Sequence, residues 1–367
     1  MKPASAGRYT PPEPAMRLRV PSSDGVQLNV EIHGSPAARG PAVVLIHGNT
    51  CSTSFWAPVI RALREDLRIV VYDQRGHGGS DIPDRSGYSV EALASDLAAV
   101  LEQTLPAAGK AVLAGHSMGG IAIMAAASRN DVIGRVSGAL LASTGCADLI
   151  AEALVVPFGG FVPPLAAAVQ HWMLTSAAPL EPFFPLSRTV LSYLTLGPDA
   201  SAEVAAVNAA VIQACDRQTR AAWGEVLSTV DVTEGVRRLD VPVHVLVGSA
   251  DRLTPPAHAR RIAELLPRCE GLTQLPRIGH MTPLEAPEEV AELIRKLAAG
   301  SAPGQRPASL AGRSRNLRLA GASRPSLLSC AHRYGAAARL GPADRASSSA
   351  SPRLMPLVST PRSGTAS

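Results

Sequence analysis

The amino-acid sequence predicts an α/β fold with a mostly parallel sheet. Short apolar runs alternate along the chain with longer segments whose apolar residues recur at helical spacing. An unbroken run such as Ala42 to Ile46 is typical of a parallel strand that helices cover on both faces. Several runs are followed by loops rich in Gly, His, Ser and Asp. The sequence therefore predicts a sheet between two helical layers, with a functional site at one edge.

The first half of the chain opens with an expected hairpin. Strands at 17–20 and 27–32 flank Asp24-Gly25, a pair that tolerates the positive φ of a tight turn. The segment 90–105 is expected to be a helix, because Leu93, Leu97 and Leu101 lie on one helical face. The further elements expected in this half are strands at 42–46, 68–72, 111–114 and 136–141, and helices at 55–64 and 118–128.

The alternation stops between residues 145 and 236. This segment predicts short helices rich in Ala, Leu and Val that prolines interrupt. The α/β pattern then resumes with expected strands at 243–247 and 271–275 and expected helices at 257–266 and 287–299. An insertion between the two halves of a sheet predicts a helical lid over the carboxyl ends of the strands.

The charge is concentrated at the end of the chain. Residues 301–367 contain ten Arg, no Lys and one acidic residue, so they carry +9 of a chain whose total is +5, and residues 1–300 carry −4. The composition of this tail, rich in Ser, Ala, Pro and Gly, predicts disorder. A tail that binds nucleic acid or an anionic membrane stays open beside the favoured interpretation, a solvated extension without function. The acidic body argues against nucleic-acid binding by the core.

The expected organisation has four parts. Residues 1–15 form a flexible N-terminal arm, residues 16–144 and 237–300 form the core, residues 145–236 form the lid, and residues 301–367 form the tail. The polar, Pro-rich start of the chain lacks the apolar segment of a secretory signal, and the apolar stretch 149–174 is broken by Pro and Gly. We therefore expect a cytoplasmic protein without a transmembrane segment, and its oligomeric state stays open.

The cysteines and histidines point to neither disulfides nor metal binding. The five Cys and nine His are scattered along the chain, with no Cys-x-x-Cys and no pair of His at metal-binding helical spacing. The expected chemistry therefore uses no metal and no organic cofactor.

The stretch Leu113 to Gly120 predicts a nucleophile. It reads Leu-Ala-Gly-His-Ser-Met-Gly-Gly and joins an expected strand to an expected helix. A serine on such a corner projects its hydroxyl from the sheet edge, and small residues such as Gly115 and Gly119 must flank it. Ser117 is thus the candidate nucleophile, and the backbone N–H of Met118 is a candidate oxyanion donor.

A candidate acid and a candidate base follow Ser117 along the chain, in the order Ser, Asp, His that a serine on such a corner requires. Asp251 comes just after the strand expected at 243–247, and His280 lies in the loop after the last expected strand. Both therefore belong to the same sheet edge as Ser117. Asp148, beyond the strand expected at 136–141, is a reserve acid.

Two further loops belong to this edge. The N–H of Asn49, in His47-Gly48-Asn49-Thr50, is the second candidate oxyanion donor, since Gly48 lets the backbone approach the substrate. In the loop that begins at Asp73, the carboxylate of Asp73 and the guanidinium of Arg75 are expected to form an ion pair that braces the turn. His47, His77 and His116 are expected to be structural.

Residues 27–299 resemble the α/β-hydrolase superfamily. The resemblance rests on five motifs: His47-Gly48, Asp73-x-Arg75-Gly76-x-Gly78-x-x-Asp81, Gly115-His116-Ser117-Met118-Gly119-Gly120, Gly248-x-x-Asp251 and Gly279-His280. It implies the α/β-hydrolase fold, with Ser117 as nucleophile, Asp251 as acid and His280 as base. The serine is unlike the aspartate of haloalkane dehalogenases and epoxide hydrolases. The chain looks more like the esterases, monoacylglycerol-type lipases, enol-lactonases and cofactor-free haloperoxidases.

The expected function is cleavage of a carboxylic ester or lactone through an acyl-enzyme. Carbon–carbon bond hydrolysis, cofactor-free perhydrolysis and non-catalytic ligand binding on the same fold are the alternatives. The lid is expected to offer an apolar pocket for a small substrate, although these side chains would serve equally well as lid core. The candidate substrate-binding residues are Phe158, Phe161, Trp172 and Met173.

Overall fold

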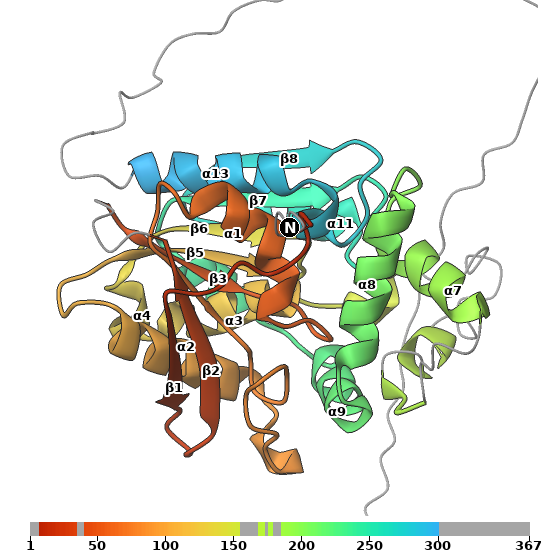
Figure 1. The fold of residues 1–367 in the computed structure, drawn as a ribbon, viewed down its shortest axis with the longest axis horizontal. Coiled ribbons are helices and arrows are strands. Elements are labelled where there is room, and N and C mark those ends of the chain that lie inside the picture. Colours follow the sequence, from red (N-terminus) through yellow and green to blue (C-terminus); the bar gives the residue numbers. More distant parts are fainter. Residues whose placement is uncertain (1–6, 35–39, 155–167, 173–174, 179–184, 301–367) are drawn as a thin grey trace, which may run out of the picture. The chain divides into compact units, whose positions relative to one another are not determined.

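The computed structural model describes residues 7–34, 40–154, 168–172, 175–178 and 185–300. Its strands form one eight-stranded sheet in the order β1-β2-β4-β3-β5-β6-β7-β8 (Figure 1). Only β2 runs against its neighbours, because it pairs antiparallel with both β1 and β4 while the other pairs are parallel. The strands are β1 (Met16–Pro21), β2 (Gln27–His33), β3 (Ala42–Ile46), β4 (Ile69–Tyr72), β5 (Ala111–His116), β6 (Val136–Ala142), β7 (Val243–Gly248) and β8 (Cys269–Leu275).

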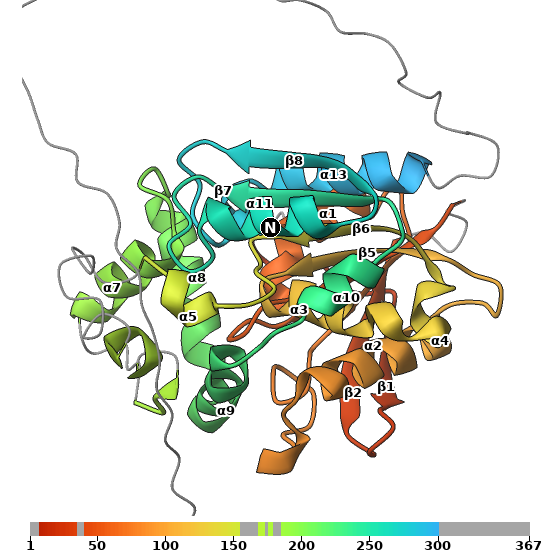
Figure 2. The ribbon, with the colours of Figure 1, turned by 180° about the vertical axis from the view of Figure 1, so that it is seen from behind.

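Helices cover both faces of the sheet (Figures 1 and 2). The helices of the core are α1 (Ala57–Leu63), α2 (Val90–Thr104), α3 (Met118–Ala125), α4 (Asn130–Ile133), α11 (Pro256–Leu265), α12 (Thr282–Glu285) and α13 (Pro287–Gly300), with short 3-10 turns η1 (Thr53–Trp56), η2 (Arg85–Gly87) and η3 (Ala126–Ser128). Residues of α2, α3 and α11 pack into one apolar core, and residues of α1, α12 and α13 pack into the other.

The apolar strands explain this two-sided arrangement. Successive side chains of a strand point to opposite faces, so in β3 Val44 enters one core while Val43 and Leu45 enter the other. All four residues of β4 are buried. The predicted α/β-hydrolase fold, with a mostly parallel sheet between helices, is thereby confirmed.

A second group of helices lies between β6 and β7 in the chain. Its members are α5 (Leu149–Glu152), α7 (Pro185–Thr195), α8 (Ala202–Ala214), α9 (Arg217–Ser228) and α10 (Thr233–Arg238). In Figure 1, the arrowheads of β7 and β8 point toward the side on which α7, α8 and α9 lie. The inserted segment, which comprises α5, α7, α8 and α9, therefore faces the carboxyl ends of the parallel strands. The remaining helix, α10, packs against α3 and α11 of the core instead (Figure 2).

The start of the described chain contacts the core. The Tyr9 hydroxyl donates to the carbonyl of Leu284 at 3.4 Å, and the Ala15 N–H donates to the carbonyl of Ile32 at 2.8 Å. The sequence predicts a flexible arm for residues 1–15, of which 1–6 lie outside the described residues. The predicted tail, 301–367, lies outside them as well. In the described part of the chain, no helix combines the length and apolar character needed to cross a membrane.

Candidate active site

Ser117 occupies the corner between β5 and α3 in a backbone conformation that few non-glycine residues adopt. Its φ is 52° and its ψ is −118°. Such a conformation costs about 1–3 kcal/mol and persists only where the surroundings enforce it. Here the Ser117 N–H donates to the carbonyl of Ala142 at 3.0 Å, and the Thr144 hydroxyl donates to the carbonyl of Ser117 at 2.8 Å. Neighbouring β6 and the loop after it thus hold the serine at the tip of the corner.

The glycines around Ser117 are required by close backbone contacts. A Cβ on Gly119 would lie 2.2 Å from the carbonyl oxygen of Ile46, and a Cβ on Gly115 would lie 2.5 Å from the carbonyl of Gly119. Neither position has room for a side chain. The start of α3 is consequently pressed against both β5 and β3.

The loop after β3 approaches the serine from the other side. A Cβ on Gly48 would lie 3.0 Å from Ser117 Cβ, so the backbone of this loop runs directly beside the candidate nucleophile. Asn49, the next residue, lines the same cavity as Ser117. Met118 is the first residue of α3, and its N–H therefore has no acceptor within the helix. These two backbone segments are the ones predicted to supply the oxyanion donors.

His280 and Asp251 are hydrogen-bonded to each other. His280 Nδ1 lies 2.9 Å from Asp251 Oδ2 and 3.1 Å from Oδ1, and both side chains are buried. Because a carboxylate only accepts, a neutral ring in this position carries its proton on Nδ1 and presents Nε2 as an acceptor. The Asp251 carboxylate also accepts from the N–H groups of Leu253 and Thr254 and from the Thr254 hydroxyl at 2.9–3.0 Å. These donors fix the carboxylate that orients the imidazole.

The backbone of His280 is held from two sides. Its N–H donates to the carbonyl of Thr195 at 2.8 Å, at the end of α7 in the inserted segment. Its carbonyl accepts from Nε2 of His116 at 2.9 Å. Burial lowers the pKa of His116 well below its ordinary value, so this ring is neutral and donates through Nε2. The residue before the candidate nucleophile thus positions the loop of the candidate base.

Glu285 ties the same loop to the inserted segment. Its carboxylate accepts from the N–H of Gly279 at 3.0 Å and from the N–H of Gly197 at 2.7 Å. The two glycines lie backbone to backbone, since a Cβ on Gly279 would lie 2.4 Å from the nitrogen of Gly197. Burial raises the pKa of Glu285 to about 6. An ionisable carboxylate therefore binds the backbone of Gly279, the residue next to His280.

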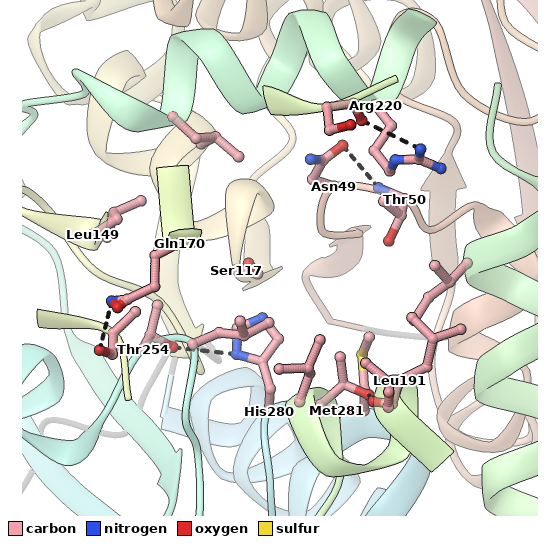
Figure 3. Close-up of a pocket in the computed structure, with 18 of the residues that line it drawn as sticks. Asn49, Thr50, Ser117, Leu149, Gln170, Leu191, Arg220, Thr254, His280 and Met281 are labelled. Carbon is pink, nitrogen blue, oxygen red and sulfur yellow. Dashed lines mark hydrogen bonds between the residues drawn. The ribbon is translucent and has the colours of Figure 1, made fainter. Parts of the chain in front are cut away.

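Ser117 and His280 line one cavity of about 380 Å³ (Figure 3). The core contributes Asn49, Thr254 and Met281 to its wall, and the inserted segment contributes mostly aliphatic side chains. Those aliphatic residues include Leu149, Val190, Leu191, Leu194, Ile212 and Leu227. Polar groups are few, among them Gln170, Thr50 and Arg220. The size and the apolar wall suit a small organic molecule.

Of the candidate lid residues, only Trp172 belongs to the described part of the chain. It lines the cavity, yet 62% of its surface is exposed, so it lies at the rim. Phe158, Phe161 and Met173 lie outside the described residues.

The structure does not use Asp148 as the reserve acid. Its carboxylate pairs with Arg261 at 3.3 Å, whereas His280 bonds to Asp251.

The expected pair between Asp73 and Arg75 is wrong. Arg75 bonds instead to Asp96 of α2 at 2.6 Å and to Asp24 of the hairpin turn at 2.7 Å. The Asp73 carboxylate accepts from the backbone N–H groups of Thr53 and Gly79. The loop is still braced, but each member of the expected pair has other partners.

The histidines near this loop make structural contacts. His47 Nδ1 donates to the carbonyl of Gly48 at 2.7 Å, and His47 Nε2 accepts from the N–H of Gln74 at 3.0 Å. His77 Nδ1 lies 3.1 Å from the carbonyl of Arg75. Burial lowers the pKa of His47 to about 4 and that of His77 to about 3, so both rings are neutral near pH 7.

Sequence reasoning missed several residues of the site. The turn that contains Thr254 has a local signal, because an aspartate side chain commonly accepts from backbone N–H groups just after it. Glu285 and Arg220 carry no such local signal. Glu285 lies in a short helix after His280, and Arg220 lies in the first turns of α9, far from any motif. Only the tertiary structure brings them to the site.

Comparisons with known proteins agree with this fold. The model of the "Alpha/beta hydrolase family" matches residues 43–293. The "Putative carbamate hydrolase RutD" of Caulobacter sp. (strain K31) is 27% identical over 292 residues, which cover 74% of this chain and 96% of that protein.

Two solved structures share the fold. An esterase from Thermogutta terrifontis superposes with a TM-score of 0.63 at 24% identity, covering 78% of this chain and 99% of that one. The enol-lactonase from Burkholderia xenovorans LB400 gives a TM-score of 0.59 at 23% identity, covering 77% and 100%. The family match spans both halves of the sheet and every loop that contributes to the candidate site, and the chain is accordingly a hydrolase of the α/β-hydrolase family.

Proposed function

We propose that this hydrolase cleaves carboxylic ester or lactone bonds through an acyl-enzyme formed on Ser117. One observation carries the proposal: Ser117, in its enforced corner conformation, lines the same cavity as His280, whose ring is oriented by Asp251. A nucleophile, a base and an orienting carboxylate are the three groups that serine-based acyl transfer needs.

The first half of the reaction forms the acyl-enzyme. His280 Nε2 takes the proton of the Ser117 hydroxyl while Oγ attacks the carbonyl carbon of the substrate. Negative charge then develops on the carbonyl oxygen, and the N–H groups of Asn49 and Met118 stabilise it. Each such donor contributes about 3 kcal/mol to the transition state. Collapse of the intermediate breaks the bond to the leaving alcohol, which receives its proton from His280.

The second half releases the acid. His280 now accepts a proton from water, whose oxygen attacks the acyl carbon, and the protonated imidazole returns the proton to Ser117 Oγ as the ester bond to the enzyme breaks. Asp251 stays ionised throughout and stabilises the imidazolium of each half-reaction. The reaction needs no group beyond these side chains and water.

The inserted segment acts, in this proposal, as the lid that selects the substrate. The cavity owes most of its apolar wall to the inserted segment, including residues of α5, α7, α8 and α9, and Trp172 lies at its rim. The substrate is therefore small and largely apolar. Exclusion of water by such a wall also strengthens the interactions with the oxyanion.

A carbamate is the second candidate substrate. The relative from Caulobacter, which the match covers almost completely, is named as a carbamate hydrolase. Attack of Ser117 on a carbamate uses the same base and the same oxyanion donors. Comparing ethyl carbamates with ethyl esters of matched size, which share ethanol as the leaving group, would show which acyl substituent the cavity accepts.

The test compares wild type with Ser117→Ala on nitrophenyl esters of increasing acyl length. Loss of the nucleophile should lower the turnover number by about a million-fold. Ser128→Ala, at an exposed serine of η3, is the matched control and should react like wild type. A fluorophosphonate probe should label wild type and the control, but not Ser117→Ala. Equal rates for all three proteins, together with equal labelling, would reject Ser117 as nucleophile.

A further inference from the structure

Arg220 is a buried cation in the wall of the candidate active-site cavity. It lies on α9, whose first turn is capped by Asp216, and only 8% of the residue is exposed. Figure 3 shows it on the same wall as Asn49 and Thr50, which come from the loop beside Ser117. A positive charge is thus placed in the cavity that holds the candidate nucleophile.

The protein partners of this guanidinium are neutral. Nη2 donates to the backbone carbonyls of Ser176, at 3.3 Å, and of Ala178. Among the described residues, no carboxylate forms an ion pair with Arg220. Arg75, which is also buried, differs in this respect, because it forms ion pairs with two aspartates. A buried guanidinium without an anion retains a large cost of desolvation.

The ionisable groups near Arg220 form no ion pair with it within the described chain, although the charge of Asp216 acts to raise its pKa. Asp216 is exposed, and its carboxylate accepts from the N–H groups of Gln218 and Thr219 at the start of the helix. Burial raises the pKa of the Cys215 thiol to about 12, so that group is uncharged near pH 7. Desolvation lowers the pKa of Arg220 itself, which is the direction expected for a cation without a partner.

We infer that Arg220 is an anion subsite that binds a carboxylate of the substrate. A guanidinium presents several N–H groups in one plane and matches a carboxylate in geometry as well as charge. The rest of the wall is mainly aliphatic, so the favoured substrate has a carboxylate at one end, a short apolar chain and the scissile bond. This inference rests on the proposed ester hydrolysis and narrows its substrate class to half-esters of dicarboxylic acids.

Matched pairs of substrates test this subsite. Monoethyl succinate, glutarate and adipate are compared with ethyl butanoate, pentanoate and hexanoate, in which a methyl group replaces the carboxylate. For the chain length that fits, kcat/KM for the half-ester relative to its neutral partner should fall by about 10- to 100-fold in Arg220→Gln. The glutamine still offers N–H donors to the carbonyls of Ser176 and Ala178. The neutral ester of each pair is the reference for the ratio, and a far-ultraviolet circular dichroism spectrum that matches wild type shows that the variant is folded.

Two further variants sharpen the comparison. Arg217→Gln removes the same charge from an exposed position of α9 outside the cavity and should leave the ratio unchanged. Arg220→Lys keeps the charge and should restore part of the preference. Glu181, three positions after Ala178, lies outside the described residues. A half-ester preference that arises only in Glu181→Gln would overturn the inference, because the native cation would then have a protein partner.

Calorimetry separates this inference from the proposed chemistry. Glutarate is titrated into Ser117→Ala and into Ser117→Ala combined with Arg220→Gln, so that the readout needs no turnover. Binding that weakens by about 10-fold or more with the arginine change supports the subsite even if no ester is hydrolysed. A wild-type enzyme that hydrolyses neutral esters, with the same substrate ratio in Arg220→Gln, would overturn the subsite and leave ester hydrolysis intact.

Discussion

Asp251 and Asp148 occupy similar positions in the sequence but very different surroundings in the fold. Both follow strands that end at the same edge of the sheet. Asp251 is buried against His280 and Thr254, whereas the Asp148 carboxylate is largely exposed beside Arg261. The site therefore offers one orienting carboxylate for His280.

We predict opposite outcomes for the two aspartates. Asp251→Asn should lower the turnover number for a nitrophenyl ester by about 10⁴-fold, because an amide that donates to Nδ1 would favour the wrong tautomer of His280. Asp148→Asn should change it less than about 2-fold. Steady-state kinetics at pH 7 and pH 9 measure both. A large loss in Asp148→Asn with little effect in Asp251→Asn would exchange their roles.

The local motifs predict the residues of the proposed triad but not the contacts that hold them. A strand, a serine between two glycines and a helix suffice to predict the corner at Ser117. The expected pair of Asp73 and Arg75 was wrong because nearness in sequence does not determine where a long side chain extends. Arg75 reaches Asp96 and Asp24, neither of which any local pattern connects to it.

At the scale of elements, the loop that carries His280 depends on the inserted segment. The end of α7 accepts the N–H of His280, and the turn after α7 lies against Gly279. Glu285, at the end of α12, bonds to both backbones. The unbroken apolar runs predict the central strands such as β3 and β4, since burial on two faces has a local signature, whereas β1 and β8 are largely exposed and lack such a run. The contact between α7 and this loop joins segments more than eighty residues apart in the sequence, and no local pattern predicts it.

Glu285 gives this contact a pH dependence. Burial raises the pKa of Glu285 from 4.5 to about 6, so the folded protein binds this proton more tightly than the unfolded chain does. The resulting stabilisation is present below about pH 4.5 and is lost as the pH rises through about 6. The wild-type free energy of unfolding should therefore lose up to about 2 kcal/mol across this window from this group alone.

The variant Glu285→Gln isolates that contribution. Gln does not ionise, so the free energy of unfolding of the variant minus that of wild type should rise by up to about 2 kcal/mol from pH 4.5 to 6 and then level off. Urea unfolding at four pH values between 4.5 and 7 measures the difference. Glu289→Gln, an exposed position of α13, reports the effect of removing a charge without this contact. A difference for Glu285→Gln that stays flat, or falls with pH, contradicts the assignment.

For the whole molecule, the candidate active site and the net positive charge lie in different parts of the chain. The described residues that line the cavity lie between Asn49 and Met281. The family match likewise lies within residues 43–293. The net positive charge lies after these residues, because residues 301–367 carry +9 while residues 1–300 carry −4. Binding to polyanions should therefore depend on the end of the chain and hydrolysis on the rest.

Truncation after Gly300 separates the two properties. The full chain should be retained on heparin at low salt and elute as the salt concentration rises, because arginines that bind a polyanion release counterions. The truncated chain should pass through, since its net charge is negative. Ester hydrolysis by the two proteins should agree within about 2-fold, because the truncation leaves every described residue of the cavity wall in place. Retention of the truncated chain would assign polyanion binding to the hydrolase body, and a large loss of activity would show that the last 67 residues contribute to the site.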